Sequence, residues 1–146
     1  MGIDDDVRPV GLTRTAGWNA GARRTIAARP DVVWHALLAE ALPLWLGTVD
    51  GSLELLRRSA YRTLEGAVGE VRGAEPGRRI RLTRSVDGAD STTIQLTVIP
   101  AATGTTVAFH EERLAGPEER AESIRAWKFA LDRIEAAFDP APSTSE

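Results

Sequence analysis

The sequence predicts an α+β fold in which a curved antiparallel sheet of about six or seven strands wraps around one long C-terminal helix. Through the middle of the chain, apolar residues recur at every second position between turn dipeptides, and over the last segment they recur with helical spacing. The 146 residues suffice for one domain, and the lack of cysteine excludes disulfides and thiolate chemistry. We expect this domain over residues 17–138, after a flexible arm (residues 1–16) and before a disordered tail (residues 139–146).

The first expected elements are one strand and two short helices. Residues 21–28 lie between Gly and Pro and contain the Ile and Thr of a strand. Pro30 suits the first turn of a helix, and the apolar residues after it predict a helix to residue 40. A second short helix over residues 42–46 ends at Gly47, which fits a left-handed C-cap.

An antiparallel meander follows these helices. Turn dipeptides such as Pro76-Gly77 and Asp87-Gly88 separate six segments of alternating apolar and polar residues: 52–57, 61–64, 67–73, 79–86, 92–99 and 105–113. Successive side chains of a strand point to opposite faces, so the apolar members of each segment share one face. In the last three segments these members are Ile80, Leu82, Val86, Ile94, Leu96, Val98, Val107 and Phe109.

The final helix is expected to begin at Pro117, with acidic residues beside the positive end of its dipole. Its apolar face consists of Ile124, Trp127, Leu131, Ile134 and Phe138. A helix of about 20 residues is roughly 30 Å long and can cross the whole concave side of the sheet. Because one helix cannot fill a curled sheet evenly at both ends, we expect a cavity between helix and sheet.

Charge and the chain ends exclude several functions. The formal net charge of −3 argues against a nucleic-acid-binding module, which needs a concentrated basic face. The acidic N-terminus is not a secretory signal, and Glu40 and Pro43 interrupt the longest apolar stretch. We therefore expect a cytoplasmic protein that does not insert into membranes.

Several segments together resemble a known superfamily. They are RTIAARPDVVWHAL at residues 24–37, LWLG at 44–47, GAVGEVR at 66–72, RIRLT at 79–83, GTTVAFHEERL at 104–114, and residues 127–134. In this order they resemble the START-like helix-grip superfamily (SRPBCC), and within it the branch named for the activator of the ninety-kilodalton heat-shock protein ATPase. The resemblance covers residues 18 to 138 and implies a deep, mainly apolar cavity for lipids, polyketides, hormones or other hydrophobic molecules.

The chain departs from this branch in two respects. Relatives often carry Trp after the Leu-Thr of the central strand, where this chain has Arg84, so the cavity is expected to be partly polar. The eukaryotic co-chaperones owe their activity to a separate N-terminal domain, so the resemblance does not imply a co-chaperone role for a one-domain chain.

Ten residues are predicted to bind the ligand: Trp45, Tyr61, Leu82, Arg84, Leu96, Phe109, Glu111, Ile124, Trp127 and Leu131. Trp45 is expected at the cavity mouth, whereas Trp127 is either core or pocket wall. By strand parity Arg84 and Glu111 both face inward unless the strand ends fray, so we expect Arg84 to approach Glu111 or Glu112 within hydrogen-bonding reach.

No metal site, cofactor or catalytic residue is predicted. The two histidines, His35 and His110, do not have the spacing of metal ligands, and His110 is expected to point outward. The sequence also lacks a nucleophile elbow, a phosphate loop and a dinucleotide fingerprint.

Three functions remain open. The leading one is noncatalytic binding of a hydrophobic small molecule, lipid- or polyketide-like. The first alternative is a cyclase- or dehydratase-type enzyme in which Arg84 with Glu111, or Tyr61, handles protons. The second is a protein-interaction module or stress-related chaperone partner, which uses the outer face of the sheet or pairs with a second copy of itself as a homodimer.

Overall fold

The computed structural model describes residues 12–13 and 17–139. Seven antiparallel strands form one sheet in the order β1-β2-β7-β6-β5-β4-β3. Their bounds are β1 (Leu12–Thr13), β2 (Gly17–Ile26), β3 (Ala60–Arg62), β4 (Ala67–Glu75), β5 (Arg79–Val86), β6 (Thr92–Ala101) and β7 (Gly104–Leu114). The described residues also form three helices, α2 (Pro30–Leu37), α3 (Leu42–Trp45) and α4 (Pro117–Phe138), each with a proline in its first turn.

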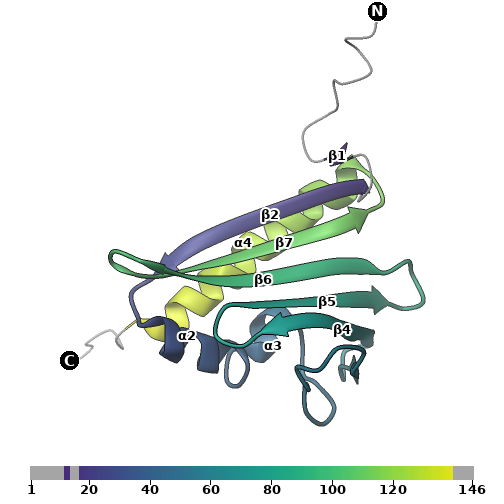
Figure 1. Ribbon diagram of the computed structural model, residues 1–146. Helices are drawn as coiled ribbons and strands as arrows, with labels where there is room; N and C mark the ends of the chain where they lie inside the picture. The colour runs from purple at the N-terminus through teal and green to yellow at the C-terminus, as the bar shows by residue number, and fades with distance from the viewer. Residues whose placement is uncertain (1–11, 14–16, 140–146) are drawn as a thin grey trace, which may run out of the picture.

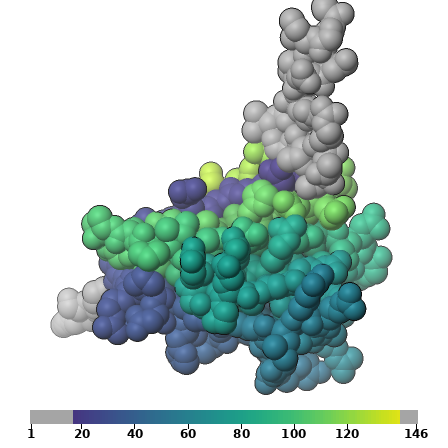
Figure 2. Space-filling model, viewed as in Figure 1, coloured from purple at the N-terminus to yellow at the C-terminus, as the bar shows by residue number. Residues whose placement is uncertain are grey.

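The predicted fold class is confirmed. The curved sheet lies across α4, with α2 beside the C-terminal end of that helix (Figure 1). In the space-filling view the strands face the viewer and hide almost all of α4 (Figure 2). Arg24 of β2 fastens the helix to the sheet, because its guanidinium lies 2.8 Å from carboxylate oxygens of both Asp132 and Glu135.

Two element predictions need correction. Residues 52–57 form no strand: Leu53 and Leu55 alternate toward the core as a strand would, but no neighbouring strand pairs with their backbone. The first strand is longer than residues 21–28 on its N-terminal side, since it begins at Gly17 and Trp18 pairs with Leu114. The predicted arm and tail lie outside the described residues, apart from Leu12–Thr13, which pair with β2, and Asp139, the C-cap of α4.

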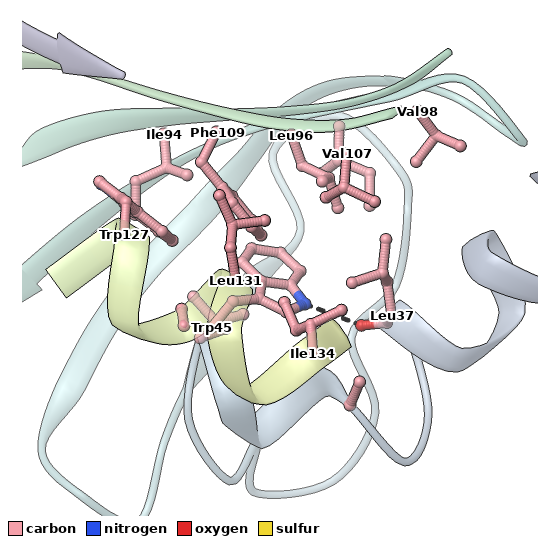
Figure 3. Close-up of a cluster of buried hydrophobic side chains, with 14 of the residues drawn as sticks. Leu37, Trp45, Ile94, Leu96, Val98, Val107, Phe109, Trp127, Leu131 and Ile134 are labelled. Carbon is pink, nitrogen blue, oxygen red and sulfur yellow. Dashed lines mark hydrogen bonds between the residues drawn. The ribbon is translucent and has the colours of Figure 1, made fainter. Parts of the chain in front are cut away.

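The core fills the space between the sheet and the three helices. Ile94, Leu96 and Phe109 point from the strands toward Trp127 and Leu131 of α4 (Figure 3). Phe109 lies against Trp127 with ring centroids 4.4 Å apart and an interplanar angle of 14°. These aromatic and aliphatic side chains hold the helix on the sheet by burial and by stacking.

One glycine allows a long side-chain reach across β4. Tyr61 of β3 pairs with Gly69, and its hydroxyl donates a 2.6 Å hydrogen bond to the backbone oxygen of Thr83 on β5. A Cβ at residue 69 would collide with that same carbonyl oxygen and approach the Tyr61 ring. The glycine at position 69 therefore permits the contact between Tyr61 and Thr83, which any larger residue there would block.

Candidate functional site

A pocket opens where the sheet meets the N-terminal half of α4. Its walls come from the end of β5 and the turn after it, the start of β6, the end of β7, and the first three turns of the helix. We call it the seam pocket, and its volume is about 410 Å³. Its lining includes Arg84 and Glu111, but the predicted deep cavity behind it is absent from the described residues, because packed core side chains occupy the space between sheet and helix.

Glu111 is the polar centre of the seam pocket. It projects from β7, is only 3% exposed, and accepts four hydrogen bonds. One carboxylate oxygen, Oε1, accepts from the Ser123 hydroxyl at 2.7 Å and from Nε1 of Trp127 at 2.9 Å. The other oxygen, Oε2, accepts from the Thr92 hydroxyl at 2.6 Å and from Arg84 at 3.4 Å. A buried carboxylate is tolerated because donors from two strands and the helix surround it.

Arg84 is the cation of the pocket. Its Nη2 lies 3.4 Å from Oε2 of Glu111, which confirms the expected approach of the two side chains. The guanidinium carbon lies 5.7 Å from the ring centroid of Trp127, within cation–π range. Its side chain is 26% exposed, so the guanidinium is held by the protein but remains in reach of a molecule in the pocket.

The rest of the lining combines apolar walls with an acidic rim. Val86, Leu114 and Ala126 contribute apolar surface from β5, β7 and α4. Three exposed carboxylates stand around the opening, those of Asp90, Glu119 and Glu122. The lining therefore offers an apolar molecule some contact area and a few placed polar groups, as ligand sites do.

Most of the other predicted ligand residues pack in the core. Leu82, Leu96 and Leu131 are 0% exposed, and Phe109 is 1% exposed. Of the two roles expected for Trp127, the structure shows the core one: its ring stacks on Phe109 and its Nε1 donates to Glu111, but it is not among the residues that line the seam pocket.

The expectation that Trp45 stands at a cavity mouth is wrong. Its side chain is 4% exposed, its Nε1 donates to the Leu37 carbonyl at 2.8 Å, and its ring lies 5.6 Å from that of Phe109 (Figure 3). The physical reason is that α3 turns this ring under the sheet, where a backbone oxygen satisfies the indole N–H and removes the need for contact with water.

Tyr61 lines a different pocket from the Arg84–Glu111 pair, one of about 670 Å³ shared with Asp50 and Glu70. Burial raises the pKa of its hydroxyl to about 12, against a smaller opposing effect of the Arg84 charge. At neutral pH this hydroxyl is therefore protonated, and it donates its hydrogen bond to the carbonyl oxygen of Thr83.

The helix presents a slightly different face from the predicted one. Ile124 is half-buried, whereas the preceding residue, Ser123, is buried and bonds to Glu111. Sequence reasoning missed both Ser123 and Thr92. Their spacing was available as a signal: Ser123 lies four residues before Trp127 on a helix, and Thr92 lies two residues before Ile94 on a strand.

The histidines lie outside the seam pocket. His35 is exposed on α2, and the His110 side chain is 43% exposed, with Nδ1 3.8 Å from a carboxylate oxygen of Glu112. Within residues 12–13 and 17–139, no three His, Asp or Glu side chains gather as metal ligands would. None of the helices in that part of the chain is both long and apolar enough to span a membrane.

Comparisons with solved structures identify the same fold elsewhere. CalU16 from Micromonospora echinospora is 21% identical, with 90% of this chain and 82% of CalU16 covered and a TM-score of 0.73. DynU16, a protein of the dynemicin biosynthetic locus, is 20% identical, with 81% of this chain covered and a TM-score of 0.70; this chain spans only 46% of DynU16. The Aha1 dimer from Colwellia psychrerythraea is 19% identical, with 82% and 95% covered and a TM-score of 0.66.

These likenesses extend to the fold alone. No family model and no curated protein sequence matches the chain. The neighbours show that a helix-grip sheet and helix of this kind occur in a protein of a biosynthetic locus and in a dimeric protein.

Proposed function

We propose that this protein binds a hydrophobic small molecule, lipid- or polyketide-like, between the sheet and α4, with its polar end toward Arg84. The observation that carries the proposal is the seam pocket, because apolar walls and a protein-held cation meet there at the junction of sheet and helix. Its volume of about 410 Å³ lies within the range of small-molecule sites. The membership of DynU16 in a biosynthetic locus supports an organic ligand of this kind.

The packed core sets the size of the ligand. Deeper entry from the seam pocket would have to separate Trp127 from Phe109, whose rings are 4.4 Å apart. A ligand that separated these rings would have to make contacts as favourable as the ring stacking and the buried apolar contacts that it broke. The favoured ligand therefore places its apolar part against Val86, Leu114 and Ala126 rather than within the core.

The cyclase-type alternative is less well supported by the geometry. It needs proton-transfer groups that converge on one cavity, whereas Tyr61 and the Arg84–Glu111 pair line different ones. Both oxygens of Glu111 already accept hydrogen bonds from the protein itself. This arrangement supports a fixed polar anchor for a ligand more than a mobile acid or base.

Two measurements test the proposal. Native mass spectrometry of the protein purified from its own host should detect a bound lipid-like molecule. Titration with the neutral fluorescent probe N-phenyl-1-naphthylamine should give saturable binding, because the probe is apolar and of a size that the pocket admits.

A matched pair of variants locates the binding. Ala126→Phe places a ring in the seam pocket and should weaken probe binding by about tenfold or more, since it fills the space without touching the core. Ala136→Phe adds the same ring at an exposed position of α4 outside this pocket and should bind as the parent does. No bound molecule together with no saturable probe binding would refute the proposal, and equal binding by both variants would refute its location.

A further inference from the structure

Arg84 has hydrogen-bonding capacity that the protein does not use. A guanidinium carries five N–H donors, and among the described residues Arg84 makes one hydrogen bond, the 3.4 Å contact with Glu111. Glu111 does not depend on this contact, because Ser123, Thr92 and Trp127 donate to it at 2.6 to 2.9 Å. The remaining donors of Arg84 are therefore available to an acceptor on a molecule in the seam pocket.

The position of the guanidinium is set before a ligand arrives. The Trp127 ring lies 5.7 Å beneath it, and Oε2 of Glu111 lies to one side. A side chain held in this way loses little conformational freedom on binding, which strengthens recognition of an oxygen acceptor. The Arg84 side chain is 26% exposed, and it shares the pocket lining with the apolar residues Val86, Leu114 and Ala126.

The charge around the pocket restricts which acceptor can bind. Among the described residues, the lining holds one cation, Arg84, and the carboxylates of Asp90, Glu111, Glu119 and Glu122. Glu111 already pairs with Arg84, so the three rim carboxylates make the approach unfavourable for an anion. A cationic ligand is attracted by the rim carboxylates, but Arg84 repels it and it has no acceptor to offer the guanidinium.

We propose that the seam pocket selects ligands which present an uncharged oxygen acceptor, a carbonyl or amide oxygen, to Arg84, and that it rejects carboxylates. This inference rests on the proposed function, because it assigns the ligand chemistry of the same pocket. Arg84 supplies the donors, the apolar walls hold the chain of the ligand, and the acidic rim excludes acids.

A series of three probes with the same chain tests the selection: decanamide, decanoate and decylamine, each kept below its micelle concentration near neutral pH. Calorimetric titration in low salt should show the amide binding about tenfold or more tightly than the carboxylate. Raising the salt should narrow that difference, because the rim carboxylates are exposed and their charges are screened. The amine should bind more weakly than the amide in both conditions.

Variants assign the selection to residues. Arg84→Met should weaken decanamide severalfold and leave decylamine unchanged or tighter, since only the amide uses the guanidinium donors. Glu119→Gln combined with Glu122→Gln should improve decanoate binding severalfold. The matched pair Glu40→Gln with Glu54→Gln removes the same charge from exposed positions outside this pocket and should leave all three affinities as they are.

The outcomes separate this inference from the proposed function. Equal binding of all three probes, or tightest binding of decanoate or decylamine, would overturn the selection while leaving small-molecule binding in place. Failure of every probe, including N-phenyl-1-naphthylamine, would overturn both.

Discussion

Replacing Glu111 should reveal how much of the attachment of α4 depends on one buried carboxylate. In Glu111→Ala the hydroxyl of Ser123, the hydroxyl of Thr92 and Nε1 of Trp127 all lose their acceptor. The two hydroxyls can rotate toward the seam pocket, but the indole N–H of Trp127, which is 3% exposed, cannot.

The expected magnitude follows from these contacts. A buried donor left without a partner destabilises a protein by about 1–3 kcal/mol, and hydrogen bonds to a charged group contribute about 1.5–3 kcal/mol each. With the space that the deleted side chain leaves, we expect Glu111→Ala to lower the free energy of unfolding by about 3–5 kcal/mol. That loss is a large part of the roughly 5–15 kcal/mol that stabilises a typical domain.

Glu111→Gln separates the acceptor from the charge. An amide oxygen in place of Oε1 still accepts from Ser123 and Trp127, while the amide NH₂ faces Thr92, which can accept, and Arg84, which cannot. We expect this substitution to destabilise the fold by only about 1–2 kcal/mol. Glu112→Gln is the control, because it makes the same change at the next residue, whose partner Arg81 has a 42% exposed side chain; about 1 kcal/mol or less is expected there.

The assay is urea denaturation followed by far-ultraviolet circular dichroism, which does not depend on the environment of Trp127. The order of stability should be parent, Glu112→Gln, Glu111→Gln, then Glu111→Ala. If Glu111→Ala lies within about 1 kcal/mol of the parent, the hydrogen bonds of Glu111 do not hold the helix as argued. If Gln destabilises as much as Ala, the charge rather than the acceptor is what matters.

Three further predictions concern the sheet and its turns. Tyr61 is the only tyrosine, so tyrosinate absorbance reports its ionisation alone. Because the pKa of Tyr61 is raised, the stability that its hydroxyl confers is complete below the ordinary pKa of 10.0 and is lost as pH rises through about 12. A titration midpoint near 10.0 in the folded protein would contradict this prediction. Gly69→Ala should lower the free energy of unfolding by about 2 kcal/mol or more in thermal melts, because its Cβ would meet the Thr83 carbonyl, whereas Gly73→Ala, with open space in the same strand, should not. The backbone N–H and then the hydroxyl of Thr48 lower the pKa of Glu65, so its carboxyl should titrate below 4.5 when followed by NMR. The stability that this carboxylate contributes should be lost as pH falls through that midpoint. If the lowered pKa persists in Thr48→Ala, the backbone contact alone suffices.

The fold could be predicted from the sequence because its strands alternate cleanly and their turns carry Gly. The parity argument also placed Arg84 and Glu111 together, since strand geometry fixes which residues share a face. The same argument failed at residues 52–57, because alternation toward a core does not require a partner strand.

The parts of the site that could not be predicted depend on contacts between distant segments. The spacing of Ser123 indicates which face of the helix it occupies, but not that its hydroxyl will donate to Glu111 on β7. The destination of the Trp45 ring likewise depends on how α3 turns, which the short apolar pattern does not determine. The sequence also does not determine that core side chains fill the space between sheet and helix, where a cavity was expected, because that depends on how distant segments pack together.

The placement of β2 has a consequence for how the chain is made. Among the described strands β2 is the first long one to leave the ribosome, yet it pairs with β7, and the pairing joins Trp18 to Leu114 and Ile26 to Thr105. During synthesis β2 must wait until the whole meander from β3 to β7 has emerged. Because closing so long a loop carries an entropic penalty and pairings distant in sequence form slowly, sheet closure should come late in folding. A nascent chain halted before β7 would expose an unpaired strand edge, which makes truncated products prone to aggregation.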